Sequence, residues 1–203
     1  MNTIYGMSAS GNCYKLALVS ELLEIPYHWN EVDILNGETQ TPHFLQINSN
    51  GKVPVLELDD GKRLPESNAA LFYLAQNSNL FPKDTFQQAQ VLQWMFFEQY
   101  SHEPAIAVAR FIKKFLPAEH ERQNQLPALH QRGYQALDVM EQQLSMNQWI
   151  SGNDYSIADI ALFAYTHVAE EGGYSLSDYS NIVEWIAKIK RLPNFISMEE
   201  IKS

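Results

Sequence analysis

The sequence is poor in cysteine and in basic residues. Cys13 is the only cysteine among 203 residues, so the chain cannot form an internal disulfide, a C-x-x-C redox pair or a zinc site built from thiolates. Lys and Arg number 14 against 24 Asp and Glu, a formal charge of −10. An acidic chain is a poor partner for nucleic-acid phosphates and for anionic lipid surfaces. We therefore expect no metal site, no nucleic acid and no membrane among its partners.

Long apolar runs are also missing. The longest apolar stretches are interrupted well before the roughly 20 residues that span a bilayer, and residues 1–15 lack the basic and apolar regions of a signal peptide. These features favour a cytoplasmic protein. Hydrophobic residues nevertheless make up 45% of the chain and charged residues only 19%. This is enough apolar material for the core of one large domain or of two small ones.

Residues 1–78 are predicted to form an α/β domain. A short strand at 3–5 leads through a Ser/Gly/Asn turn into a helix that ends at Pro26, and residues 27–32 form a second strand. This order implies a parallel strand pair joined by a right-handed crossover. The further elements are a short helix from Thr41-Pro42, strands at 53–58 and 62–64 around an Asp-Asp-Gly turn, and a helix that Ser67 caps and that ends near Asn77.

Residues 79–85 are predicted to link this domain to an all-helical domain at 86–203. Beyond the linker the apolar period becomes helical and the strand signal disappears. Ser156-Ile-Ala-Asp159 resembles a capping box with aspartate in place of the usual Glu or Gln. Helices are expected at about 86–115, 126–145, 156–170 and 180–191, with Pro104 placed to kink the first and Pro127 placed to open the second.

The turn before the first helix is the most informative place for chemistry. A helix N-terminus offers unpaired N–H groups and about half a positive charge, so it suits an anion such as a thiolate. Redox enzymes with this order of elements have C-x-x-C here, whereas this chain has Ser10-Gly11-Asn12-Cys13. A serine hydroxyl can donate a hydrogen bond to a sulfur anion of a ligand, which favours thiol activation over disulfide exchange. The alternative is that Ser10 only caps the helix.

Two further clusters lie where a strand and a helix begin. Lys52-Val53-Pro54 opens the third strand. If the Val53–Pro54 bond is cis, the Val53 backbone turns toward the first helix and can pair with a peptide ligand; the alternative is a trans proline at a sheet edge. Glu66-Ser67 opens the third helix, where a hydroxyl, N–H groups and a carboxylate suit both charges of an amino-acid end. The alternative there is a plain N-cap beside a favourable charge.

With these residues together, the chain resembles a cytosolic glutathione transferase of the serine type over essentially its whole length. The first half resembles the thioredoxin-like domain of the family and the second half resembles its helical domain. Each matching segment is short, but their order and spacing are specific. They are Ser-Gly-Asn-Cys-Tyr-Lys at 10–15, Asn-Gly-Lys-Val-Pro-Val-Leu at 50–56, Leu-Pro-Glu-Ser at 64–67, Ser-Ile-Ala-Asp-Ile at 156–160 and Leu-Pro-Asn-Phe at 192–195.

The resemblance implies a homodimer that uses glutathione as its co-substrate, with no other cofactor, beside an apolar pocket for an electrophile. Ser10 falls at the position of the catalytic serine, whose hydroxyl stabilises the glutathione thiolate, and Asn12 assists or replaces it. The other implied contacts are Val53 and Pro54 with the cysteinyl backbone, Glu66 and Ser67 with the γ-glutamyl end, and Lys52 or, as a weaker candidate, Gln40 with the glycine carboxylate.

Asn68 and Cys13 lie next to these positions in the sequence. Asn68 stands where several serine-type relatives carry arginine, so the charge network around the γ-glutamyl group is expected to be weaker or built differently. Cys13 is expected to pack inside the first helix, because free cysteine is often buried.

The electrophile pocket is expected near a kink in the first helix of the second domain. Aromatic residues at helical spacing are as easily explained by core packing or by a dimer surface as by a pocket, and a lone histidine usually has a structural role. The pocket candidates are Met7, Tyr100, His102, Arg110 and Tyr165.

The same fold leaves three functions open. The first is an enzyme that adds glutathione to electrophiles or uses it to reduce peroxides. The second is a glutathione-dependent disulfide reductase, which some bacterial relatives with an asparagine in this turn resemble. The third is a binding or stress-response protein without turnover.

Overall fold

Strand β1 (Asn2–Gly6) lies inside a four-stranded sheet in the computed structural model, which describes residues 1–201. The strand order is β2-β1-β3-β4. β1 pairs in parallel with β2 (Tyr27–Glu31) and antiparallel with β3 (Val55–Glu57), and β3 pairs antiparallel with β4 (Arg63–Pro65). The predicted α/β order and the predicted parallel pair are confirmed.

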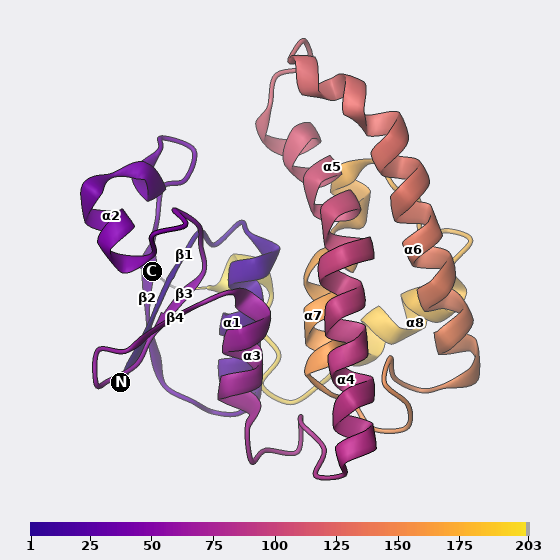
Figure 1. Cartoon of the computed structure of the whole chain (residues 1–203). Coiled ribbons are helices and arrows are strands. Elements are labelled where there is room, and N and C mark those ends of the chain that lie inside the picture. The colour runs from indigo at the N-terminus through magenta and orange to yellow at the C-terminus, as the bar shows by residue number, and fades with distance from the viewer. Residues whose placement is uncertain (202–203) are drawn as a thin grey trace. The chain divides into compact units, whose positions relative to one another are not determined.

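Different helices cover the two faces of this sheet, as Figure 1 shows. α1 (Gly11–Leu22) and α3 (Ser67–Ala75) pack against each other on one face. α2 (Pro42–Ile47) lies on the other face, after a 3₁₀ turn at Glu38–Gln40. The Thr41 hydroxyl accepts a hydrogen bond from the backbone N–H of Phe44 and so caps α2 as predicted.

The register of β1 and β3 separates two layers of core. Ile4 lies opposite Leu56, and both are fully buried. Tyr5 lies opposite Val55. Because successive side chains of a strand point to opposite faces, these two pairs belong to different layers. The Tyr5 and Val55 layer also contains Phe44 and Ile47 of α2.

The end of β1 approaches the start of α1 very closely. A Cβ atom added to Gly6 would lie 2.9 Å from the Cβ atom of Cys13 and 2.9 Å from the ring of Trp29. Only glycine fits at such a separation. The turn between β1 and α1 is therefore held tightly against the sheet.

The helical unit is built on a long interrupted helix. The predicted helix at 86–115 forms α4 (Thr85–Phe97), a π-helical turn (Glu98–His102) and α5 (Glu103–Phe115). Pro104 has no N–H to bond a carbonyl one turn earlier, so the regular helical ladder is broken at the predicted place. The remaining elements are a 3₁₀ turn at Glu121–Gln125, α6 (Leu126–Met146), α7 (Ile157–Thr166), a 3₁₀ turn at Ala169–Gly172 and α8 (Ser180–Ile189).

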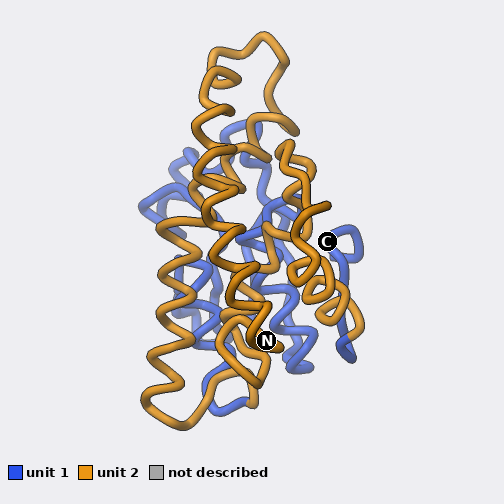
Figure 2. Tube along the Cα trace, turned by 90° about the vertical axis from the view of Figure 1, so that its right-hand side faces the viewer, with its two compact units in different colours: residues 1–78, 192–203 blue, residues 79–191 orange. Residues whose placement is uncertain are grey.

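The described residues form two compact units, residues 79–191 and residues 1–78 with the segment that follows 191 (Figure 2). The sequence instead suggests a helical domain that runs from 86 to 203, of which residues 202–203 lie outside the described residues. The segment joins the first unit through Tyr14, whose hydroxyl donates to the carbonyl oxygen of Ile196 at 2.7 Å. Such a contact between residues so distant in the chain leaves no trace in local periodicity.

α7 is the buried centre of the helical unit, and all of its residues are buried. The predicted capping box at Ser156 and Asp159 is present. The Asp159 carboxylate accepts hydrogen bonds at 2.9 Å from the backbone N–H groups of Ser156 and Ile150 and from the indole N–H of Trp185. Burial raises the pKa of Asp159, and these donors offset part of that effect.

We predict that Asp159→Ala lowers the free energy of unfolding by about 3 kcal/mol, because several donors lose their acceptor inside the core. Urea denaturation measures this change. Asp154→Ala is the matched control, since Asp154 is exposed a few residues earlier, and it should stay within about 0.5 kcal/mol of the unaltered protein. Equal effects of the two substitutions would contradict this role of Asp159.

Candidate functional site

Ser10 occupies the N-cap position of α1. Its backbone is extended, with φ −91° and ψ 124°, and within residues 1–201 its hydroxyl makes no capping hydrogen bond. Its backbone N–H donates to the carbonyl oxygen of Met7 at 2.9 Å, so the turn is fixed by the main chain. The alternative that Ser10 serves mainly as a side-chain cap therefore has no support in the geometry. The half-buried hydroxyl lies at the positive end of the helix.

Glu31, at the end of β2, holds the turn that precedes Ser10. Its carboxylate accepts hydrogen bonds from the backbone N–H of Ser8 at 2.9 Å and from the Ser8 hydroxyl at 3.2 Å. It also accepts one from the indole N–H of Trp29 at 2.6 Å. Sequence analysis missed this carboxylate, because residues 8 and 31 meet only through the parallel pairing of β1 and β2.

The Cys13 thiol is a packing group. The residue is 0% exposed. Burial raises the pKa of the Cys13 thiol to about 12, and a hydrogen bond with the Ser10 side chain offsets only part of this. A thiol that stays protonated and covered is neither a nucleophile nor a metal ligand, in agreement with the expected packing role.

The Val53–Pro54 peptide bond is cis, which is one of the two conformations left open by the sequence. Val53 is half-buried, Pro54 is buried and Lys52 is exposed. The side chain of Asn48 organises this loop, because its amide nitrogen donates to the carbonyl oxygen of Lys52 at 2.8 Å. Its amide oxygen accepts from the backbone N–H of Asn50 at 3.0 Å.

Gln40 reaches the same loop from the 3₁₀ turn before α2. Its side-chain nitrogen donates to the carbonyl oxygen of Gly51 at 3.2 Å, although the residue is exposed. Gly51 has φ +61°, and a Cβ atom there would lie 2.6 Å from the Gln40 side-chain nitrogen. Gln40 and Lys52 are thus brought to one loop, which lies beside the cis proline.

α3 begins at Ser67, one residue earlier than the predicted cap at Ser67 implies. Glu66 is the N-cap residue, and it has a positive φ of 72° with ψ 111°. A non-glycine residue in this region is strained, and such strain gathers at functional sites. Glu66 is exposed whereas Ser67 is only 5% exposed. The prediction that Ser67 caps the helix is wrong, because the Ser67 hydroxyl is engaged by α1 instead.

Lys15 is the residue of α1 that reaches the start of α3. The side chain is 0% exposed. Its ammonium nitrogen lies 3.3 Å from the Ser67 hydroxyl oxygen and 3.2 Å from the side-chain oxygen of Asn68. The Ser67 hydroxyl in turn donates to the side-chain oxygen of Asn12 at 3.2 Å. The network expected to be weaker or built differently around Asn68 thus contains a cation from another helix.

Lys15 was missed by the sequence analysis. It stands inside the segment 10–15 that carries the family resemblance, but no role was predicted for it. The available signal was a cation one turn after a polar helix start. The role of this cation depends on the packing of α3 against α1, which the sequence pattern does not show.

The pocket candidates in the helical unit have different environments. Tyr100 is 84% exposed, whereas His102 is fully buried and Tyr165 is 7% exposed. The ring nitrogen Nε2 of His102 lies 2.9 Å from the Thr166 hydroxyl, which itself donates to the carbonyl oxygen of Leu162 at 2.7 Å. Since that hydroxyl has one proton, Nε2 of His102 is the donor. The geometry therefore favours a structural role for His102.

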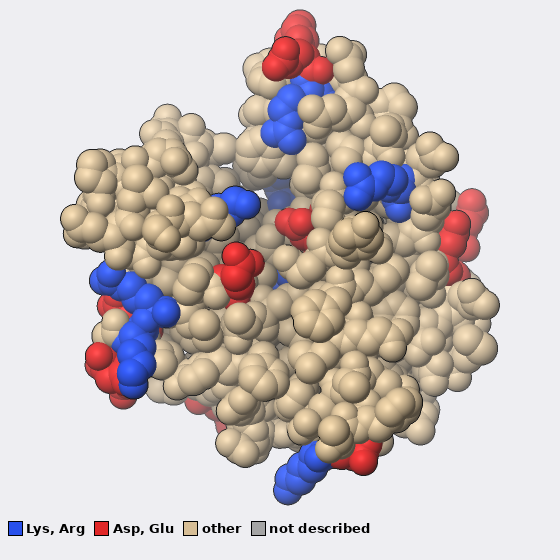
Figure 3. All heavy atoms as spheres, in the orientation of Figure 1, with Lys and Arg blue, Asp and Glu red and all other residues tan. Residues whose placement is uncertain are grey.

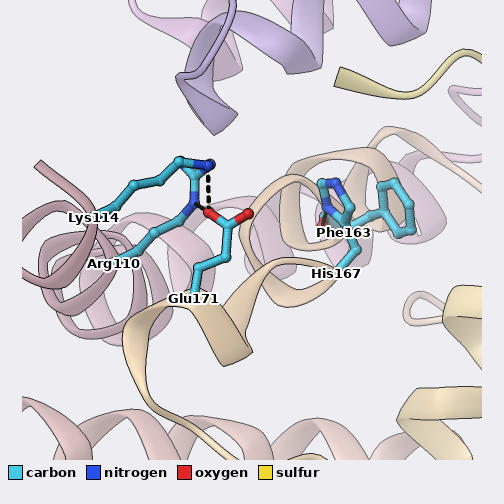
Figure 4. A network of polar contacts seen from close by, with 5 residues as sticks. All are labelled: Arg110, Lys114, Phe163, His167 and Glu171. Atoms are coloured by element: carbon cyan, nitrogen blue, oxygen red, sulfur yellow. Dashed lines mark hydrogen bonds and ion pairs between the residues drawn. The ribbon is translucent and has the colours of Figure 1, made fainter. Parts of the chain in front are cut away.

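Arg110 takes part in a charged cluster of the same unit, which Figure 4 shows. Arg110 and Lys114 both project from α5 toward the carboxylate of Glu171, with nitrogen to oxygen distances of 2.7 Å each. The Arg110 side chain is only 4% exposed. The fifth candidate, Met7, is half-buried in the turn before Ser10. Whether any of the five contacts a substrate stays a prediction.

Residues 1–201 offer neither a cluster of metal ligands nor a membrane-spanning helix. Their His, Cys, Asp and Glu side chains form no group of three or more that could hold a metal ion. None of the helices described in that range is both long and apolar enough to span a bilayer. On the face that Figure 3 shows, charged side chains are scattered over a largely uncharged surface.

The topology and the two polar helix starts define a thioredoxin-like α/β unit combined with a helical unit. The chain belongs to the glutathione S-transferase family. Residues 9–77 match the family profile described as "Glutathione S-transferase, N-terminal domain", and residues 100–193 match "Glutathione S-transferase, C-terminal domain". The family resemblance and the fold class inferred from the sequence are confirmed.

Individual relatives agree with this assignment. A glutathione S-transferase from Pseudomonas fluorescens is 55% identical, with a TM-score of 0.94 over 97% of this chain and 98% of that one. A Burkholderia graminis glutathione transferase with two glutathione molecules bound per subunit is 29% identical, with a TM-score of 0.82 over 95% and 85%. The disulfide-bond oxidoreductase YfcG of Escherichia coli is 29% identical over 194 residues, which cover 90% of this chain and 87% of YfcG.

We predict that native Cys13 resists a thiol-specific reagent up to about pH 9, because a thiol with a pKa of about 12 is almost entirely protonated there. Raising the pH to this value should therefore not start the reaction. Mass spectrometry of the labelled protein measures the result. In denaturant the same chain should take up one label, and rapid labelling of the folded protein would contradict the burial of this thiol.

Proposed function

We propose that the protein is a glutathione transferase, which binds glutathione on its first unit and ionises the glutathione thiol. The thiolate then attacks an electrophilic small molecule, by substitution or conjugate addition, or reduces a peroxide. The observation that carries the proposal is the Ser10 hydroxyl, which lies at the α1 N-terminus without a capping hydrogen bond in residues 1–201. Family membership and the glutathione bound to the B. graminis relative support it.

Each residue of the site has a chemical role in this proposal. Ser10 and Asn12 donate hydrogen bonds to the glutathione sulfur. The backbone of Val53, beside the cis Pro54, pairs with the cysteinyl backbone. The remaining contacts are Glu66 and Ser67 with the γ-glutamyl end, and Lys52 and Gln40 with the glycine carboxylate. The second pairing is consistent with the place of Lys52 and Gln40 at one loop beside the cis proline.

These groups can supply the free energy that is needed to ionise the glutathione thiol at neutral pH. A thiol with a pKa of about 8.5 is about 3% ionised at pH 7, and a pKa of about 6.5 would make it about 75% ionised. That change corresponds to about 2.7 kcal/mol. One hydrogen bond to a charged group contributes about 1.5 to 3 kcal/mol and a helix terminus about 0.3 to 1 kcal/mol. Local donors must supply this, because the chain has a net charge of −10.

The setting of the enzyme is also part of the proposal. We propose a cytoplasmic homodimer with a hydrophobic electrophile as second substrate and no cofactor besides glutathione. The single, buried cysteine is consistent with a reducing compartment.

A second candidate function is glutathione-dependent disulfide reduction. The relationship to YfcG, named a disulfide-bond oxidoreductase, favours it, and so does Asn12 in the turn after Ser10. Both functions need a glutathione thiolate at α1. They differ in the acceptor, which is an electrophilic carbon or peroxide in one case and a mixed disulfide in the other.

The proposed function predicts saturable binding of glutathione in calorimetry and a bound thiol with a pKa well below about 8.5, measured by thiolate ultraviolet absorbance against pH. Turnover is then measured with aryl halides, peroxides and mixed disulfides. Activity on mixed disulfides alone would favour the reductase. Binding with an unshifted thiol and without turnover would leave only a binding protein.

We predict that Ser10→Ala lowers the conjugation rate at about pH 6.5 roughly tenfold, the effect of losing one hydrogen bond to the thiolate. The half-saturation concentration for glutathione should change less, because thiolate stabilisation concerns reactivity more than capture. Steady-state kinetics with varied glutathione separate the two. Ser8→Ala is the control, since Ser8 keeps its backbone bond to Glu31. If only glutathione affinity falls, Ser10 is a binding residue and Asn12 is the main donor.

A further inference from the structure

A buried row of polar groups connects the two ends of the proposed glutathione site. It runs from the Lys15 ammonium to the Ser67 hydroxyl at 3.3 Å, and from that hydroxyl to the side-chain oxygen of Asn12 at 3.2 Å. Lys15 and Ser67 are 0% and 5% exposed. The row starts at Lys15 of α1, passes through Ser67 in the first turn of α3 and ends at Asn12 in the first turn of α1.

The direction of the hydrogen bonds in this row follows from the donors of Lys15 and from the orientation of the Asn12 side chain in the structure. A lysine ammonium has only donors, so the Ser67 oxygen must accept from Lys15. A hydroxyl has a single proton, which Ser67 gives to Asn12. Asn12 therefore presents its oxygen to Ser67. Because the oxygen and the NH₂ group are separate substituents on the carbon of one planar carboxamide, the NH₂ group points in a different direction from the oxygen that faces Ser67.

The orientation of Asn12 decides its effect on a sulfur anion. An amide NH₂ group donates to a thiolate and lowers the thiol pKa, whereas an amide oxygen in the same place repels the thiolate and raises the pKa. Aligned hydrogen bonds also polarise one another in a buried setting. A cation at the far end of the row therefore strengthens the correct orientation.

We infer that Lys15 is a positioning residue, which acts through the Ser67 hydroxyl to orient the Asn12 carboxamide with its NH₂ end toward the glutathione thiol. This inference rests on the proposed function for the identity of the ligand. It links the α3 start, proposed to bind the γ-glutamyl end, to the α1 start, proposed to activate the thiol. Lys15 itself touches no reacting atom, since its side chain is covered.

The first test uses the ligand-free protein. The Asn12 side-chain NH₂ resonances are identified by their loss in Asn12→Ala, with ¹⁵N-labelled protein. Lys15→Met should shift them, because the row loses its cation. Lys62→Met is the matched control, since it removes one positive charge from an exposed lysine of the same unit, and it should leave them unchanged. Unchanged Asn12 resonances in Lys15→Met would overturn the inference.

The second test measures the pKa of bound glutathione by thiolate absorbance at saturating ligand. Lys15→Met should raise it by about 1, the size of one hydrogen bond to a charged group. In an Asn12→Ala background, Lys15→Met should have almost no further effect on this pKa. In the otherwise unaltered protein, Lys15→Arg should raise the pKa less than Lys15→Met does. An equal rise in both backgrounds would overturn the inference, because Lys15 would then act independently of Asn12.

Ser67→Ala covers the case that Lys15→Met does not fold. It breaks the row in the middle and keeps the buried ammonium, so it should also raise the pKa of saturating bound glutathione. An unchanged pKa would overturn the inference. If the unaltered protein binds no glutathione, the proposed function fails, and the resonances of the ligand-free protein still decide whether Lys15 orients Asn12.

Discussion

A buried ammonium group sets the polar architecture of the first unit. An ammonium removed from water needs hydrogen-bond acceptors, and Lys15 finds them on Ser67 and Asn68 in the first turn of α3. Because Lys15 lies early in α1, these bonds hold together the starts of two helices that are more than 50 residues apart in the chain. A helix N-terminus is a favourable place for an anion to bind. One buried cation therefore holds two such N-termini next to each other.

In the proposed function an acidic protein binds an anionic ligand. With a net charge of −10, the chain has no general positive field to attract glutathione. Helix termini, hydroxyl groups and one enclosed cation act at short range instead, where low polarity strengthens them. The sequence comparison led us to expect an altered network around Asn68, and the cation of that network comes from α1.

The helical unit is organised by a different buried charge. The Asp159 carboxylate joins the start of α7 to the loop before it and to Trp185 of α8.

Residues that are close in the sequence of this unit have different environments. Tyr100 and His102 are two positions apart, and one is exposed while the other is in the core. Both lie in the π-helical turn, and side chains two positions apart on a helix do not share a face.

The amino-acid sequence by itself determined the order of elements, the parallel start of the sheet, the break in the regular helix at Pro104 and the capping box at Ser156, because each depends on residues within a few positions of one another. It also determined the family, through short segments in a fixed order. Tertiary structure decided that Ser67 faces Lys15 instead of capping α3, that Glu31 holds the Ser8 turn, and that residues 192–201 join the first unit. These contacts join residues far apart in the chain, and local periodicity carries no information about such partners.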